Sequence, residues 1–172
     1  MYDTQRTTEQ ILSMLAAAPG RIANLSEGAP AALLHMPPEA EEWSARDVLA
    51  RMCACCDMWG KSIALILRED RPTFKAVNPL TWIKQTDYLE QEFHPSLRAF
   101  TLQRAELVEG LKPLGTAAWS RAATVTGAGK PLQRTVYTYA LWLAKHELQH
   151  LRQIERIVSA LQQVKIAAEV GG

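Results

Sequence analysis

The clearest chemical signal in the sequence is a pair of histidines near its C-terminal end. His146 and His150 are four residues apart, so on a helix their side chains lie one turn apart on the same face. They also continue an apolar stripe between Leu143 and Ile154, which predicts that both imidazoles face the interior. Two imidazoles arranged in this way can bind one divalent cation, but hydrogen bonds to a buried carboxylate or to water would satisfy them as well. The pair alone leaves both roles open.

The same segment also matches a zinc-peptidase motif. The residues from His146 to His150 read H-E-x-x-H, in which the glutamate, here Glu147, serves as general base. The longer metzincin pattern fails, because Arg156 stands where the third histidine belongs. Glu169 is a conceivable distant ligand, but its position three residues from the C-terminal end predicts a tail too loose to hold a metal. A zinc peptidase is therefore a remote alternative.

Three cysteines lie close together in the middle of the sequence. Cys53, Cys55 and Cys56 fall within four positions, and on one helix they cannot form a disulfide framework. Their pattern indicates a reducing, intracellular environment. We interpret them first as small buried side chains, with metal ligation or thiol reactivity as the alternative.

Length and composition indicate an ordinary globular protein. The 172 residues, of which 48% are hydrophobic and 22% charged, predict a single domain over residues 1–172. A net charge of +1 shows no basic footprint for nucleic acid. No apolar run is long enough to span a membrane, and the polar first ten residues do not resemble a signal peptide. We therefore expect a cytoplasmic location, with neither nucleic acid nor membrane as a partner.

Apolar periodicity predicts an all-α protein. The expected helices cover about residues 7–18 with a continuation to 25, 45–68, 80–90, 94–111 and 135–164. Ser44, followed by Asp47 three positions later, predicts a capped start for the second of these helices. Glycines at 127 and 129 favour a short hairpin or irregular segment before the last helix. Four main helices with one apolar face each predict a four-helix bundle. The five tryptophans could line a pocket, but at these spacings they are assigned first to the core.

Two stretches of the sequence resemble the DinB-like superfamily. Residues 43–52, followed by Trp59, resemble the family's W-S-x-x-E/D-V-L-x-H-L opening of the second helix. Residues 146–154 resemble its H-D/E-x-x-H-L-x-Q-I motif in the fourth helix. The resemblance implies a four-helix bundle, commonly a homodimer, that holds nickel, zinc or iron on three histidines. It also implies, for characterised members, transferase or isomerase reactions that use a low-molecular-weight thiol.

This sequence departs from the family pattern at one ligand position. His146 and His150 match two of the three histidines, but the position of the third is occupied by Arg51, which stays protonated and cannot bind a cation. One outcome is a metal-free pocket in which Arg51 contacts an anionic ligand. A second is that Cys55, one turn beyond Arg51, supplies a substitute thiolate for a two-histidine, one-cysteine metal site. A third is an inert remnant.

These outcomes correspond to different functions. The first hypothesis is a metal- or small-thiol-dependent transferase with a degenerate metal site and an unassigned reaction. The alternative is a non-catalytic protein, either one that binds a small ligand or a stress-associated dimer. The sequence alone does not choose the substrate.

Overall fold

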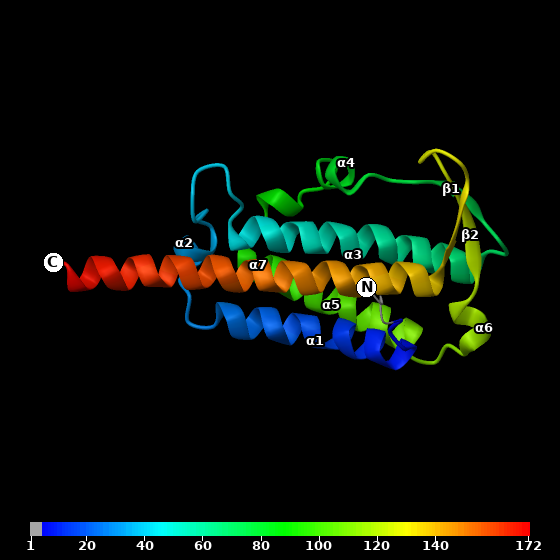
Figure 1. Ribbon diagram of the computed structural model, residues 1–172, viewed down its shortest axis with the longest axis horizontal. Coiled ribbons are helices and arrows are strands. Elements are labelled where there is room, and N and C mark those ends of the chain that lie inside the picture. Colours follow the sequence, from blue (N-terminus) through cyan, green and yellow to red (C-terminus); the bar gives the residue numbers. More distant parts are fainter. Residues whose placement is uncertain (1–4) are drawn as a thin grey trace.

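The computed structural model describes residues 5–172, and within them four long helices form a bundle (Figure 1). These are α1 (Thr8–Ser26), α3 (Ala45–Arg68), α5 (Phe93–Leu111) and α7 (Val136–Val170). The shorter elements are α2 (Ala31–Leu34), β1 (Thr73–Lys75), α4 (Pro79–Ile83), the 3-10 helix η1 (Tyr88–Glu90), α6 (Thr116–Trp119), β2 (Ala122–Thr126) and β3 (Leu132–Thr135). The prediction of an all-α four-helix bundle is confirmed. No helix within residues 5–172 has the length and apolar character needed to cross a membrane.

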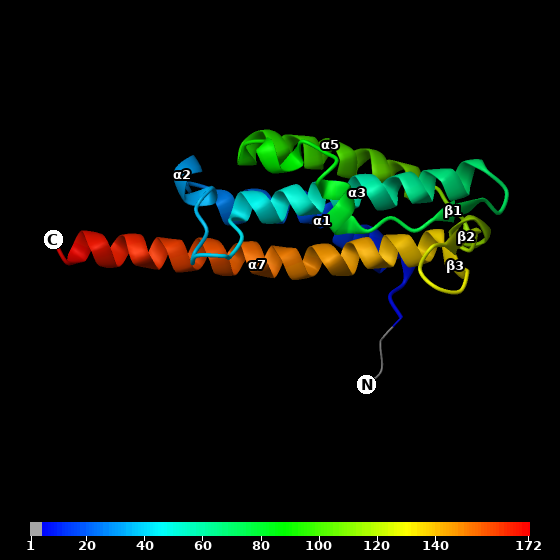
Figure 2. The same cartoon turned by 90° about the horizontal axis from the view of Figure 1, so that it is seen from above.

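The bundle has a simple packing pattern. Helix α7 packs against α1 and α3, and α5 packs against the same two helices, so α5 and α7 lie diagonally opposite. Helices α1 and α7 run in one direction, whereas α3 and α5 run in the other (Figures 1 and 2). Because α3 and α5 are parallel neighbours, residues 69–92 must return along the bundle, and this crossover contains β1, α4 and η1.

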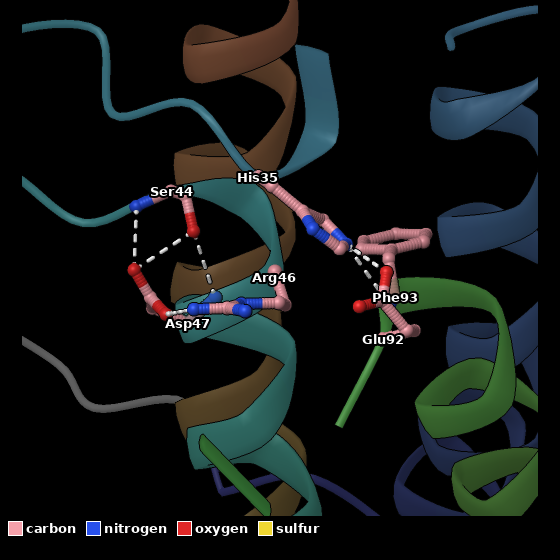
Figure 3. Close-up of polar contacts among 6 residues, drawn as sticks. All are labelled: His35, Ser44, Arg46, Asp47, Glu92 and Phe93. Atoms are coloured by element: carbon pink, nitrogen blue, oxygen red, sulfur yellow. Dashed lines mark hydrogen bonds and ion pairs between the residues drawn. The ribbon is translucent and has the colours of Figure 1, made fainter. Parts of the chain in front are cut away.

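Capping boxes fix the starts of α1 and α3. In α3 the backbone N–H of Asp47 donates to the hydroxyl of Ser44 at 3.2 Å, and the backbone N–H of Ser44 donates to the Asp47 carboxylate at 3.1 Å (Figure 3). Thr7 and Gln10 make the same reciprocal pair of bonds at the start of α1. Each box satisfies two backbone donors that a helix start leaves without partners, so the predicted cap at Ser44 is confirmed.

A histidine outside the predicted site ties the loop after α1 to the start of α5. The Nε2 atom of His35 lies 3.3 Å from the backbone nitrogen of Phe93 and 3.2 Å from the Glu92 carboxylate (Figure 3). This contact holds the entrance of α5 against the end of α2.

Two helices are longer than the sequence pattern indicates. Helix α1 continues without a break past Pro19, and α7 reaches Val170 instead of ending near residue 164. The C-terminal end of α7 extends beyond the other helices (Figures 1 and 2). Glu169 is therefore helical, and its assignment to a loose tail was wrong.

The helix predicted over residues 80–90 is instead two short elements. Asn78 caps α4 by accepting from the backbone N–H of Leu80 at 2.8 Å. The hydroxyl of Thr86 then donates to the carbonyl of Ile83 at 2.8 Å. Such a local side-chain bond replaces a helical one, so α4 ends there and the chain resumes as η1.

A small sheet closes one end of the bundle. Strands β2 and β3 are antiparallel and form the predicted hairpin, whose turn contains Gly127 and Gly129 at φ +86° and +89°. Strand β1 was not predicted and pairs in parallel with β2. Its register aligns Phe74 with Val125. It is only three residues long and its partner is about 50 residues away, so no local pattern marks it.

A buried ion pair joins the two diagonal helices at the centre of the bundle. Arg104 of α5 and Glu147 of α7 are 1% and 2% exposed, and the guanidinium donates to both carboxylate oxygens. Burial alone would lower the pKa of Arg104, but the hydrogen bonds and charge of Glu147 raise it above its ordinary value. Arg104 also donates to the Cys56 sulfur of α3 at 3.5 Å.

The remaining bond of Arg104 depends on a proline in α1. Pro19 has no backbone N–H, so the carbonyl of Leu15, four residues earlier, loses its helical partner. Arg104 donates to that carbonyl at 3.1 Å, which satisfies a buried acceptor and allows α1 to continue through Pro19. Arg104 thus makes polar contacts with all three of the other long helices.

We expect Arg104→Ala to lower the free energy of unfolding by about 3–5 kcal/mol, because it leaves the Glu147 carboxylate buried without a counter-ion. A double variant, Arg104→Met with Glu147→Leu, removes both charges and should recover most of this loss. Urea unfolding followed by circular dichroism measures both, with exposed Arg98→Ala on the same helix as control. A loss below about 1 kcal/mol for Arg104→Ala would show that the ion pair is not what holds the helices together.

Candidate functional site

Helix α7 brings the two predicted histidines together. The Nε2 atoms of His146 and His150 are 3.0 Å apart, and the rings meet edge to face. The Nδ1 atom of His150 lies 2.8 Å from the side-chain oxygen of Gln153 and therefore donates to it. A neutral His150 then accepts through Nε2, so His146 donates through its own Nε2. This leaves Nδ1 of His146 as a buried acceptor with no hydrogen-bond partner among the described residues.

Both imidazoles are held in the neutral form. Burial, together with the neighbouring His150 and Arg51, lowers the pKa of His146 to about 3. Burial also lowers the pKa of His150, although its bond to Gln153 partly opposes this effect. Neither ring carries a charge near pH 7.

Cys55, on α3, lies beside the histidine pair. Its sulfur lies 3.6 Å from Nε2 of His146. Burial raises the pKa of the Cys55 thiol to about 11, while the charge of Arg51 acts in the opposite direction. Cys55 is therefore a neutral thiol at pH 7. It is buried, as are Cys53 and Cys56, and all three are free thiols.

Arg51 lies one turn before Cys55 on α3. Its guanidinium carbon is 5.0 Å from the centre of the Trp43 ring, and its Nε atom is buried without a hydrogen-bond partner among residues 5–172. The Arg51 charge lowers the pKa of His146, His150 and Cys55. The fold therefore brings His146, His150 and Cys55 into contact, and Arg51 lies close enough for its charge to affect all three.

These residues do not fit a three-ligand metal centre. Two neutral imidazole nitrogens converge, which suits a divalent cation. However, no group of three or more His, Cys, Asp or Glu side chains within residues 5–172 is arranged to hold a metal ion. Cys55 approaches His146 but would first have to lose its proton, and the permanent charge of Arg51 would repel a cation placed beside the pair.

The geometry also contradicts the zinc-peptidase interpretation. Glu147 points away from the histidine pair into the bundle centre, where Arg104 binds both of its oxygens. A general base must be able to reach a water molecule, and Glu147 is 2% exposed. Glu169 follows His150 by 19 positions on the same helix, which separates them by roughly 28 Å at 1.5 Å per residue.

The pair lies between two features of the surrounding structure. On one side, Trp59 of α3 packs its ring against His146, with ring centres 5.4 Å apart. On the other side, His150 borders a cavity of about 350 Å³. The rest of that cavity is lined by Glu41, Glu42, Trp43, Gln153, Arg156 and Ile157.

Two partners of the histidines were not predicted from the sequence. Gln153 could have been found, because it lies three positions after His150 and therefore on the same helical face. Trp59 matched the family-like stretch but was assigned to the core, and its contact with His146 crosses between two helices.

We expect the partly buried neutral histidines to make stability depend on pH. In the unfolded chain a histidine titrates near pH 6.5, whereas His146 titrates near 3 when folded. Between these values the unfolded state binds more protons, so stability is complete above pH 6.5 and falls as the pH decreases toward 3. Each group contributes a slope of at most about 1.4 kcal/mol per pH unit.

Urea unfolding between pH 4.5 and 8, with a chelator present, measures this dependence. The variant His146→Gln with His150→Gln should show a flatter profile below pH 6.5. His94→Gln, which removes an exposed histidine, is the control and should keep the wild-type slope. Equal slopes in wild type and double variant would contradict the assignment of both rings as neutral.

Comparisons with known proteins agree with this architecture. YfiT from Bacillus subtilis, described as a probable metal-dependent hydrolase with an unusual four-helix bundle topology, is similar with a TM-score of 0.70. The alignment covers 91% of each chain at 16% sequence identity, so it shows a shared fold alone. No curated protein matches the sequence. A family model described as the DinB superfamily matches residues 14–154, and this chain therefore belongs to the DinB superfamily.

Proposed function

We propose that this DinB-superfamily protein binds a small acidic molecule beside the His146–His150 pair without a metal ion. The observation that carries the proposal is Arg51, which stands at the position where the family resemblance implies a third histidine. Its charge lowers the pKa of both imidazoles and of Cys55. The site therefore has a fixed positive charge where a metal-binding relative would have a metal ligand.

The chemistry of the site favours a carboxylate or a thiolate. A guanidinium binds a planar carboxylate through two parallel hydrogen bonds, and Nε of Arg51 is buried with no partner among residues 5–172. Arg51 also favours the ionised form of a thiol nearby, as it does for Cys55. Low-molecular-weight thiols that carry carboxylates combine both groups and are the first ligands to test. In a transferase reaction of this kind, Arg51 rather than a metal ion would stabilise the thiolate form of the ligand.

The cavity that His150 borders limits the size of such a ligand. Glu41 and Glu42 line it together with Arg156, and both glutamates are exposed. A large anion would place negative charge near these two glutamates, whose repulsion is weakened but not removed by solvent and salt. We therefore expect a small ligand whose acidic group lies at Arg51.

Metal content tests the proposal directly. Protein purified without a nickel column should hold less than about 0.1 equivalent of nickel, zinc or iron by elemental mass spectrometry, because only two neutral donors converge. Arg51→His replaces the cation with a third imidazole and should bind about one equivalent of added zinc. Arg51→Ala removes the charge without adding a donor and is the matched control.

One outcome would replace the proposal with its alternative. If the wild type holds about one equivalent of metal that Cys55→Ser abolishes, the two-histidine, one-cysteine site is correct and the metal-free assignment is wrong. The alternative is supported by the position of Cys55 and His150, both of which contact Nε2 of His146.

Ligand binding tests the role of Arg51. Small carboxylates and carboxylate-bearing thiols should raise the melting temperature of the wild type by several degrees at saturating concentration. Arg51→Ala should remove the increase, and Arg51→Lys should keep only part of it, because an ammonium lacks the planar fork. Arg46→Ala, on the first turn of the same helix, is the control. An undiminished shift in Arg51→Ala would exclude Arg51 from the binding site.

The homodimer expected from the family resemblance stays a prediction.

A further inference from the structure

A second cavity is lined by the C-terminal half of α3, the N-terminal part of α7, the small sheet and Trp82 of α4. Figure 1 shows where the sheet meets the ends of α3 and α7. The volume of the cavity is about 310 Å³. We infer that this cavity binds a planar aromatic carboxylate of one or two rings. The inference goes beyond the proposed function, because none of Arg51, Cys55, His146 and His150 lines this cavity, although Trp59 of its wall also packs against His146.

Aromatic side chains form the walls of this cavity. The cavity is lined by five of them: Trp59, Trp82, Trp142, Tyr139 and Phe74. Several of them support one another: the Tyr139 and Trp142 rings meet edge to face at 5.7 Å, and the Trp59 and Trp142 rings are 6.2 Å apart. Aromatic rings held by other rings present flat surfaces that lose little conformational freedom when a ligand binds. A planar ring system matches these surfaces.

The charged residues of the cavity are all positive. Lys61, Lys75 and Arg134 line it, and no Asp or Glu does. Lys61 is paired with Asp57 at 3.1 Å, but neither Lys75 nor Arg134 has an ion-pair partner within residues 5–172. The cavity therefore has uncompensated positive charge, which selects for an anion.

Arg134 is the best placed of these cations. Its guanidinium carbon lies 4.2 Å from the centre of the Trp142 ring, so the group lies on an aromatic wall, and its N–H groups have no acceptor among the residues that the structure describes. A guanidinium that is fixed on one face and free at its edge is suited to a carboxylate on a ligand stacked nearby.

A third observation also indicates a polar ligand atom. The indole nitrogen of Trp82 is buried and has no hydrogen-bond partner among the described residues. Trp82 lines the cavity, and Lys61 lies 4.9 Å from its ring centre. Buried N–H groups without acceptors are rare in proteins, so a ligand that displaces the groups covering this nitrogen would gain a hydrogen-bond donor. The cavity volume is at the lower end of the range for small-molecule sites, roughly 300–1,000 Å³, which limits the ligand to one or two rings.

The indole N–H signals of the five tryptophans test the inference in a single spectrum. Titration of ¹⁵N-labelled protein with 2-naphthoate should shift the signals of Trp59, Trp82 and Trp142, and leave those of Trp43 and Trp119 unchanged. Calorimetry should show at least about tenfold weaker binding for the uncharged analogue 2-naphthamide and for the non-aromatic cyclohexanecarboxylate. These comparisons use the wild-type protein, so they do not depend on whether a variant folds.

Substitutions at Arg134 provide the second test. Arg134→Ala should weaken 2-naphthoate binding about tenfold or more, and Arg134→Lys should lie between it and the wild type. The control is Arg152→Ala, an exposed arginine on α7. Binding that is absent at millimolar ligand, or equal for naphthoate and naphthamide, would overturn the inference. So would a shift of Trp43 that Arg51→Ala abolishes, since this would place the ligand at the Arg51 site instead and support the proposed function.

Discussion

The buried carboxylate of Glu147 sets a constraint that the rest of the bundle satisfies. A charge at the centre of a helical bundle is tolerated only when a partner neutralises it, and Arg104 does so from the diagonally opposite helix. The same guanidinium satisfies the Leu15 carbonyl that Pro19 leaves without its helical bond. Glu147 therefore fixes the rotation of α7 about its axis. With about 100° between successive residues, a Glu147 that faces the centre turns His146 and His150 toward α3.

This rotation creates the electrostatic character of the candidate site. Two partly buried imidazoles and a buried thiol stay neutral, because burial lowers the pKa of both histidines and raises the pKa of Cys55. Arg51 is then the one permanent charge among the four residues. A site built from neutral donors attracts a cation, whereas the same site with a guanidinium attracts an anion. The proposed function therefore depends on the side chain at position 51, because it decides whether the site carries a permanent positive charge.

The features that the sequence could predict are those encoded over a few neighbouring positions. The cap at Ser44, the apolar stripes and the common face of the histidine pair all follow from spacings of three or four residues. The Arg104–Glu147 pair could not be predicted, since it joins positions 43 residues apart, and Glu147 seemed instead to belong to a peptidase motif. The aromatic cavity was only an alternative at the level of sequence, for another reason. Tryptophans at these spacings are usually core residues, and the residues that line the cavity come from separate parts of the chain, among them α3, α4, α7 and the three strands.

The likeness to YfiT illustrates how fold and site depend on different residues. The two chains share a fold across 91% of their lengths at 16% identity, so a few constraints suffice to specify the bundle: apolar stripes on four helices and capped starts. Chemistry depends on far fewer positions and is lost or altered by one substitution, because a metal centre needs every ligand. This chain has the two histidines on α7, and the charged side chain of Arg51 lies near them on α3. The fold therefore identifies the superfamily, whereas the reaction must be inferred from the four side chains that meet between α3 and α7.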